Sequence, residues 1–509
     1  MPSIVLATLN ARYAHASLGL RCLRANLGAL RADSAIVEFI LGARTEEVIE
    51  KLLALAPRIV GFGVYIWNVE ETTKIVAALK AVAPEVIVVL GGPEVSHEVD
   101  AQPVCRLADY VVTGWGDVTF AALARQILDG PRPLMKVHAG AQPPLAEVVL
   151  PYGEYTDEDV ARRHVYVEAS RGCPFRCEFC LSALDRTAWP FPLDEFIAQL
   201  GRLYRRGARH FKFVDRTFNL KVDASLAILG FFLERIDADR GDPPFVHFEL
   251  IPDHLPERLR QVIARFPAGT LQFEIGIQTF DERVQRLISR RQDNAAAEAN
   301  LRWLRERTNA HLHVDLIAGL PGEDLAGFAR GFDRLVGLRP HEIQVGILKR
   351  LRGAPIARHT EAFGLRFNPQ PPYNILATDS IDFATMQRLA RFARYWDLVA
   401  NSGRFARTLP LLLGEAPFTR FLAFADALYA ATGRTHAIAN ERLYEHVHAD
   451  LLAQGVEPAA ATEALAADYL ASGARGRLGF VDIEPLARAM RREEAVAAAP
   501  QRQQRHLRA

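Results

Sequence analysis

The sequence contains little cysteine, almost no net charge and no long uninterrupted apolar run. Its 509 residues include 5 cysteines, 61 basic residues and 60 acidic residues, so the formal net charge is +1. An odd and small number of cysteines does not suit the disulfide framework of a secreted protein. The balanced charge excludes a bulk electrostatic attraction to nucleic acid or to an anionic membrane. No apolar segment approaches the ~18 residues that a membrane-spanning helix needs.

The composition does supply enough apolar residues for several buried cores. Half of the residues are hydrophobic and 9% are aromatic, which is too much for a disordered chain. At roughly 100–200 residues per domain, the length predicts two to four domains. The chain opens on the strand-like run 4–9, with no charged leader or cleavable apolar segment, so we expect a cytoplasmic protein.

The first domain, residues 1–135, alternates strand and helix patterns. Apolar runs predict buried strands at 4–9, 36–41, 59–66, 86–90 and 110–112. This alternation predicts a doubly wound parallel sheet, whose ligand should lie beyond the carboxyl ends of the strands. Glycines and aromatic residues follow several of these strands, where they could line a flat ligand or serve as ordinary turn residues.

The remaining chain divides into a linker, a second alternating domain and a helical end. Residues 136–160 contain prolines without periodicity and predict a linker. Residues 161–370 predict a partial (β/α)6 barrel of the TIM type. Its expected strands are 165–169, 210–214, 245–250, 271–277, 312–317 and 343–348. Residues 371–509 show helical patterns and predict a helical domain, whose polar, basic end at 491–508 we expect to fray.

Three of the five cysteines, Cys173, Cys177 and Cys180, fall within eight residues. They follow the first expected barrel strand, at the face where such barrels carry function. Three thiolates on one loop can hold a cubane iron–sulfur cluster with one iron left open. Zinc completed by a distant ligand such as His164 or His210, or three free thiols, are the alternatives.

The segment 170–180 resembles the signature loop of radical S-adenosylmethionine (radical SAM) enzymes, with an aromatic residue, Phe179, just before the last cysteine. The resemblance implies that the three cysteines ligate a 4Fe-4S cluster and that Phe179 belongs to the S-adenosylmethionine (SAM) site. The open iron would bind the amino and carboxylate groups of SAM. Electron transfer would then cleave SAM to methionine and a 5′-deoxyadenosyl radical.

Further stretches match this family in order. Asp215 stands where the family often has Gly-Gly-Glu, resembles an Asp-containing variant, and is expected to pair with an ammonium group. The resemblance also places Glu249, Glu274 and Gln278 near ribose or methionine groups of SAM; each could instead be an ordinary strand residue. Residues 314–323 resemble the fifth-strand motif, which implies that Gly319 and Pro321 lie beside adenine, with the glycines of the motif admitting a flat ring.

The N-terminal sheet resembles the cobalamin (vitamin B12)-binding module that often precedes this barrel, so the resemblance covers about residues 1–350. It implies a set of cobalamin-lining residues: Asn10, His15, Tyr65, Trp67, Asn68, Gly91, Gly92, Gly114 and Gly116. The motif Asp-x-His-x-x-Gly, which supplies a histidine to cobalt, is absent. We therefore expect the lower base of cobalamin to be displaced without a histidine replacing it, unless the module keeps only the fold.

These features predict a cobalamin-dependent radical SAM enzyme that methylates an unactivated carbon of a small molecule. An electron donor such as flavodoxin or ferredoxin would be its partner; neither a membrane nor nucleic acid is expected to be one. A radical rearrangement or oxidation without methyl transfer is one alternative, and a non-catalytic zinc-binding module is another. The C-terminal helical region resembles only a domain of unknown function, and no catalytic side chain is assigned.

Overall fold

The computed structural model describes residues 1–185, 187–474, 476–482 and 501–507. By packing, the chain forms two compact units. Unit 1 comprises Met1–Arg216, Lys349–Ala357 and Asn368–Asn374; unit 2 comprises Thr217–Leu348, Arg358–Phe367 and Ile375–Ala509. Within the described residues, no helix has both the length and the apolar character that crossing a membrane requires.

The N-terminal sheet has six parallel strands in the order β2-β1-β3-β4-β5-β6. Their bounds are β1 Ile4–Asn10, β2 Ser34–Ile40, β3 Ile59–Gly63, β4 Ile87–Gly91, β5 Tyr110–Thr113 and β6 Val137–Ala139. The first five confirm the predicted strands. The sixth lies in the predicted linker, where a three-residue edge strand leaves too short a pattern to detect.

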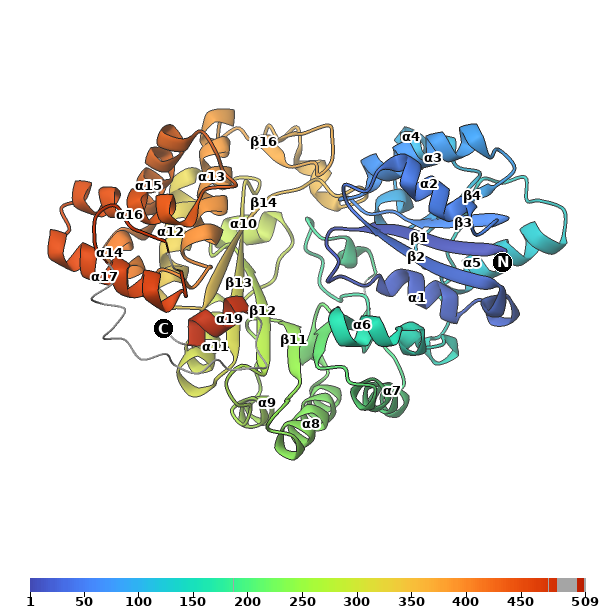
Figure 1. The fold of residues 1–509 in the computed structure, drawn as a ribbon, viewed down its shortest axis with the longest axis horizontal. Helices are drawn as coiled ribbons and strands as arrows, with labels where there is room; N and C mark the ends of the chain where they lie inside the picture. The colour runs from blue at the N-terminus through green and yellow to red at the C-terminus, as the bar shows by residue number, and fades with distance from the viewer. Residues whose placement is uncertain (186, 475, 483–500, 508–509) are drawn as a thin grey trace. The chain divides into compact units, whose positions relative to one another are not determined.

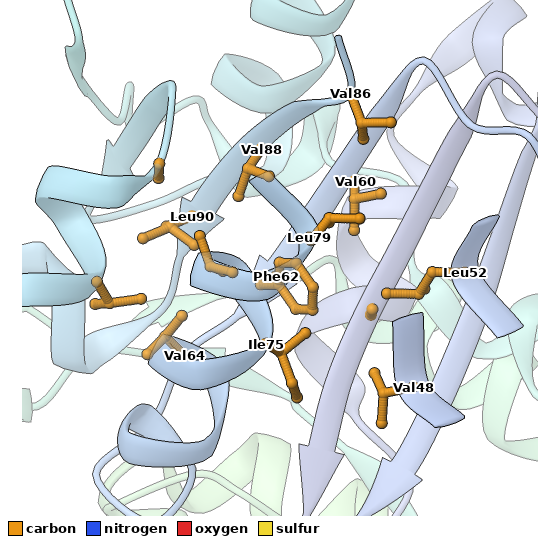
Figure 2. Packing of buried hydrophobic residues seen from close by; sticks show 14 of the residues in the cluster. Val48, Leu52, Val60, Phe62, Val64, Ile75, Leu79, Val86, Val88 and Leu90 are labelled. Atoms are coloured by element: carbon orange, nitrogen blue, oxygen red, sulfur yellow. The ribbon is translucent and has the colours of Figure 1, made fainter. Parts of the chain in front are cut away.

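Helices cover both faces of this sheet. They are α1 Leu18–Ala25, α2 Thr45–Leu53, α3 Val69–Val82, α4 Pro103–Leu107 and α5 Asp117–Asp129. A further helix, α6 Asp157–Arg162, follows β6 in the chain. Alternate strand residues such as Val60, Phe62 and Val88 pack with α2 and α3, as Figure 2 shows, and α4 belongs to the same core. The intervening residues, such as Ile59 and Val89, pack with α1 and α5. Both faces are therefore apolar, as a doubly wound sheet requires.

The second sheet has the strand order β14-β13-β12-β11-β10-β7 and forms the partial barrel. Its strands are β7 Val165–Val167, β10 His210–Phe213, β11 Phe245–Leu250, β12 Leu271–Gln278, β13 His311–Ala318 and β14 Glu342–Ile347. All six confirm predicted strands to within about two residues. Its helices are α7 Leu193–Arg205, α8 Val222–Ala238, α9 Glu257–Ile263, α10 Glu282–Leu287, α11 Asn294–Arg307 and α12 Leu325–Gly337.

The C-terminal region is helical, as predicted (Figure 1). Its helices are α13 Phe383–Val399, α14 Leu409–Leu413, α15 Pro417–Thr432, α16 Asn440–Ala453, α17 Pro458–Ala471 and α19 Gln501–Leu507. The expected fraying is wrong for 501–507, because these residues form a helix that buries Gln503. The rest of the expected tail, 491–500 and 508, lies outside the described residues.

Residues 349–374 bring two short segments into unit 1, where they bind the loop after β4. Glu94 on that loop is 4% exposed. Its Oε1 accepts from the Tyr373 hydroxyl (2.7 Å) and from Arg352 Nε (3.0 Å). Arg352 also pairs with Glu98 (2.7 Å). A buried carboxylate needs such partners, so the loop after β4 depends on residues more than 250 positions away in sequence.

Candidate functional site

The three clustered cysteines lie on a loop whose base is closed by the antiparallel ribbon of β8 (Ser170–Arg171) and β9 (Trp189–Pro190). Cys177 is buried, Cys173 and Cys180 are half-buried, and none of the three is in a disulfide. The N–H of Cys180 donates to Cys177 O (3.1 Å), which curls the loop between these two residues. The ribbon and this turn hold the three thiols on one short, constrained segment.

The donor set fits an iron–sulfur cluster with one open iron. Burial raises the pKa of the Cys173 thiol to about 11, and the neighbouring Cys180 and Cys177 add to the rise. Within the described ranges, no group of three or more His, Cys, Asp or Glu side chains is arranged to hold a single metal ion. A cubane distributes its thiolates over separate irons, which suits three neighbouring thiols of this kind.

Asp215, two residues beyond β10, holds the start of the cysteine loop. It is 3% exposed. Its Oδ2 accepts from the N–H of Ala169 (3.0 Å), and its Oδ1 accepts from the hydroxyl of Ser170 (2.6 Å). Burial raises the pKa of Asp215 to about 7. Carboxylate oxygens have further lone pairs, so the predicted ammonium contact stays a prediction beside this loop-holding role.

A cavity of about 300 Å³ lies at the carboxyl ends of β3, β4 and β5 in unit 1. Residues of α1 and α5 form one wall, and the sheet forms the other. Both walls contain glycines, which have no side chain to fill the cavity: Gly19 in α1, and Gly61 and Gly63 in β3. Phe120 and Val112 also line the cavity. A narrow apolar cavity between helices and a sheet can accept a flat, largely apolar group.

Five of the nine predicted cobalamin-lining residues line this cavity: Tyr65, Gly91, Gly92, Gly114 and Gly116. Gly92 has φ +111°, and a Cβ there would lie 2.5 Å from Val64 O, so the position requires glycine.

The other four predicted residues, Asn10, His15, Trp67 and Asn68, are not among the lining residues. Asn68 is fully buried and donates to Leu9 O and Gly63 O, while Asn10 donates to Glu38 (2.9 Å). Trp67 stacks on Tyr65 (4.4 Å between centroids) and is 45% exposed. His15 Nδ1 lies 2.6 Å from the Tyr166 hydroxyl. The four residues were predicted because each follows or ends a strand. In the structure their side chains make the contacts above and do not line the cavity.

One end of the cavity is charged. Arg171, on β8, lines the cavity and pairs with both oxygens of Asp117 (2.7 and 3.2 Å) at the start of α5. Its Nε also donates to Glu168 (2.8 Å), the residue after β7. The guanidinium lies over the Trp115 ring (5.1 Å) and 3.7 Å from Cys22 Sγ. Arg171 thus connects the cavity wall to the cysteine loop, whose first cysteine is two residues further on.

This charged cluster was not predicted from the sequence. Its one sequence signal is the position of Arg171 directly before the Gly172-Cys173 pair. Cys22 also differs from an ordinary core cysteine, because it lines the cavity. Cys105, by contrast, packs in the apolar core between the sheet and α2–α4.

In unit 2, three predicted SAM-site residues lie on or at the ends of strands. Glu249 on β11 and Glu274 on β12 are register partners, so their side chains share one face of the sheet. Glu274 lies 3.2 Å from His247 Nε2. Gln278 ends β12 with φ +68°, where the register with β13 shifts. Left-handed non-glycine residues are strained and cluster at functional sites, which supports a functional role for Gln278.

Gly319 and Pro321 follow β13 and are buried. Gly319 has φ +87°, and a Cβ there would lie 2.6 Å from Ile375 Cγ2 and 3.1 Å from Met386 Cε. Protein side chains therefore fill the space beside this glycine. This close approach packs the C-terminal helical region onto the strand end. The expectation that the motif lies beside adenine stays a prediction.

Glu323, in the same motif, is expected to make stability fall with rising pH. It is 3% exposed, accepts from the Thr279 hydroxyl (2.6 Å), and burial raises its pKa to about 8. Between its ordinary pKa near 4.5 and 8, the folded chain binds a proton that the unfolded chain releases, so stability is lost as pH rises through this window. We expect the free energy of unfolding, measured with urea from pH 5 to 9, to decline less steeply with pH in Glu323→Gln than in wild type.

The control for this prediction is Asp324→Asn, at the neighbouring exposed position. Asp324 caps α12 by accepting from the N–H of Gly327 (2.7 Å), and asparagine caps equally well. The control should keep the wild-type pH dependence. Identical profiles for wild type and Glu323→Gln would contradict the assignment of the raised pKa to this carboxyl group.

Three family models match successive parts of the chain. Residues 4–124 match the B12 binding domain, residues 167–334 match the Radical SAM superfamily, and residues 361–501 match a protein family of unknown function, DUF4080. These domains imply a 4Fe-4S cluster, SAM and cobalamin as cofactors.

Among curated proteins, the cobalamin-dependent radical SAM methyltransferase TokK of Streptomyces tokunonensis is 26% identical over 62% of this chain and 51% of its own length. The chain thus spans about half the length of this relative.

Two solved structures share the fold. TsrM, a radical SAM methyltransferase from Kitasatospora setae with cobalamin and a [4Fe-4S] cluster bound, aligns with TM-score 0.58 and 17% identity over 73% of this chain and 82% of its own. OxsB, a cobalamin-dependent SAM radical enzyme with aqua-cobalamin bound, aligns with TM-score 0.61 and 14% identity over 92% of this chain and 79% of its own. By these family matches, the chain carries a B12-binding domain followed by a domain of the Radical SAM superfamily.

Proposed function

We propose that this protein is a cobalamin-dependent radical SAM enzyme that methylates an unactivated carbon of a small molecule. The observation that carries the proposal is the joining of two sites in unit 1. The cysteine loop and the glycine-thinned cavity share one residue, Arg171, which belongs to the loop's closing ribbon and lines the cavity. A zinc-binding loop has no need of such a cavity.

When bound, the cluster supplies the electron that cleaves SAM, and cobalamin supplies a methyl carrier. Cys173, Cys177 and Cys180 would hold the cluster. The cavity would take the displaced lower base of cobalamin, since its walls are thin and apolar. His15 is engaged with Tyr166 (2.6 Å). That contact supports the expectation that no histidine replaces the lower base.

The similarity to TokK, a cobalamin-dependent radical SAM methyltransferase, supports methyl transfer as the reaction. We infer a small-molecule substrate, because the balanced charge of the chain offers no bulk attraction to nucleic acid. The reductive step requires an electron donor, and flavodoxin or ferredoxin fits that chemistry. The cytoplasm, where reducing conditions disfavour disulfides, suits five cysteines that form no disulfide in the structure.

Anaerobic reconstitution tests the proposal. The purified chain receives iron, sulfide and hydroxocobalamin, followed by SAM and a strong reductant, and the products are separated by chromatography. We expect 5′-deoxyadenosine together with S-adenosylhomocysteine, the product of methyl transfer from SAM. Formation of 5′-deoxyadenosine alone, with or without bound corrinoid, would favour rearrangement or oxidation. If neither nucleoside forms, the proposal is wrong.

Filling the cavity should abolish corrinoid binding and leave the cluster intact. Gly91 lines the cavity, and the nearest atom to a Cβ there is Val112 O at 3.7 Å, an ordinary contact. Gly91→Leu should therefore fold, occupy the cavity and lower bound corrinoid at least tenfold at unchanged iron content. Gly230→Leu, where no atom lies within 4 Å of a Cβ, is the matched control in α8. Equal corrinoid binding by both variants would refute the cavity assignment.

A further inference from the structure

The helix α19 packs on the amino-terminal ends of three neighbouring barrel strands within unit 2 (Figure 1). Gln503 is 6% exposed, and its amide contacts the side chain of Gln272, the second residue of β12. The His506 ring meets the ring of His311, the first residue of β13, edge-on at 5.3 Å between centroids. This short helix is therefore an integral part of the barrel packing, although most of it lies beyond the matched family regions.

Arg502 makes the charged contacts of α19. Its Nη2 lies 2.8 Å from Glu342 Oε2 and 2.8 Å from Asp397 Oδ1, and its Nε donates to Asn401 O (2.8 Å). The Asp397 side chain is 39% exposed, but that of Glu342 is only 5% exposed. Loss of Arg502 should therefore affect Glu342 more than Asp397, because removing one partner of a buried pair leaves an uncompensated charge.

Glu342 extends this contact along the sheet. Its Oε1 lies 3.2 Å from His311 Nε2, and its Oε2 lies 3.3 Å from His313 Nδ1. His313 Nε2 in turn lies 3.4 Å from Asp315 Oδ1. His311, His313 and Asp315 alternate along β13, so they share one face of the strand. The contacts form a continuous row from the amino end of β13 toward the motif at its carboxyl end.

The charges in this row alternate in sign. Burial opposes protonation of His313, but the adjacent carboxylates of Asp315 and Glu342 outweigh it and raise the pKa of His313 to about 10. Arg502 and His313 are thus cations, and Glu342 separates them. Without Arg502, the imidazolium of His313 would remain the nearest counter-charge of buried Glu342, and its hold on Asp315 would weaken.

We propose that Arg502 is a positioning residue for the SAM site, and that it acts through Glu342 and His313 to hold the Asp315 carboxylate. Asp315 is the register partner of Gly276 on β12, at the point where the register shifts before Gln278, the predicted SAM-site residue with left-handed backbone. The inference rests on the proposed function, because SAM is the ligand concerned. It gives the end of the C-terminal region a role in ligand binding.

The test compares SAM affinity among variants of the reconstituted, oxidised holoenzyme by isothermal titration. Arg502→Met removes the charge and keeps an apolar side chain of similar reach, and Arg502→Lys keeps the charge. Arg505→Met is the control on the same helix, because Arg505 donates to Ser402 O and not to Glu342. Glu342→Gln removes the next group in the row and serves if Arg502→Met does not fold.

Arg502→Met and Glu342→Gln should each raise the dissociation constant of SAM about tenfold, the effect of about 1.4 kcal/mol. Arg502→Lys should restore most of the affinity, and Arg505→Met should match wild type. Combining Arg502→Met with Asp315→Asn should be no worse than Asp315→Asn alone, because coupled residues are not additive. Wild-type affinity in Arg502→Met, or an equal loss in Arg505→Met, would overturn the inference while SAM binding by wild type leaves the proposed function standing. Failure of wild type to bind SAM would overturn both.

Discussion

Replacing Arg171 with methionine is expected to lower the free energy of unfolding of unit 1 by about 3–5 kcal/mol, the usual cost of breaking a buried ion pair from one side. The side chains of Arg171, Asp117 and Glu168 are only 13%, 5% and 17% exposed. Two carboxylates would lose their shared cation in a water-poor environment. Urea unfolding of the isolated variant, followed by tryptophan fluorescence, measures the loss.

The control for this prediction is Arg44→Met in the same unit. Arg44 is 73% exposed and lies 3.9–4.0 Å from Glu46 and Glu47, so its pairs are solvent-screened. Its loss should cost less than about 1 kcal/mol. A destabilisation of Arg171→Met no larger than that of Arg44→Met would show that the cluster at the cavity does not depend on this guanidinium.

Replacing Cys177 with alanine should remove the iron–sulfur cluster and reduce SAM cleavage to background. Cys177 is the buried member of the three thiols, and a cubane held by three cysteines has no spare protein ligand. Iron and acid-labile sulfide, measured chemically after anaerobic reconstitution, should fall together with 5′-deoxyadenosine formation. Full iron content with turnover in Cys177→Ala would contradict the ligand assignment.

Cys105→Ala provides the matched control, because Cys105 is 2% exposed and packs in an apolar core. Its loss creates a small cavity and should cost about 1 kcal/mol of stability without loss of iron. The pair of variants separates a ligand role from the general effect of removing a buried thiol.

The strands were predictable because parallel strands buried on both faces read as continuous apolar runs. The run 4–9 and the strand Ile4–Asn10 differ by one residue. The edge strand Val137–Ala139 escaped prediction, since three residues beside prolines carry no usable period. The helix near the end of the chain was not predicted, for a different reason. The helix Gln501–Leu507 depends on tertiary contacts such as that of Arg502 with Glu342, which its polar composition does not show.

The cysteine loop was predictable because spacing alone limits what three thiols can hold. The cavity was only half predictable, because a position after a strand does not reveal where a side chain points. Asn68 illustrates this, since its side-chain amide donates hydrogen bonds to the backbone carbonyls of Leu9 and Gly63. Arg171 and Asp117 are 54 positions apart. No local pattern encodes such a pair, so the charged end of the cavity required the structure.

The return of residues 349–357 and 368–374 to unit 1 has a consequence for synthesis of the protein. The N-terminal sheet emerges from the ribosome first, but Glu94 obtains Arg352 and Tyr373 only after roughly 160 further residues beyond Arg216 have been made. At 5–20 residues per second, this takes about 8–30 s. During that interval the loop after β4, which carries part of the cavity wall, lacks the partners of Glu94 on the nascent chain.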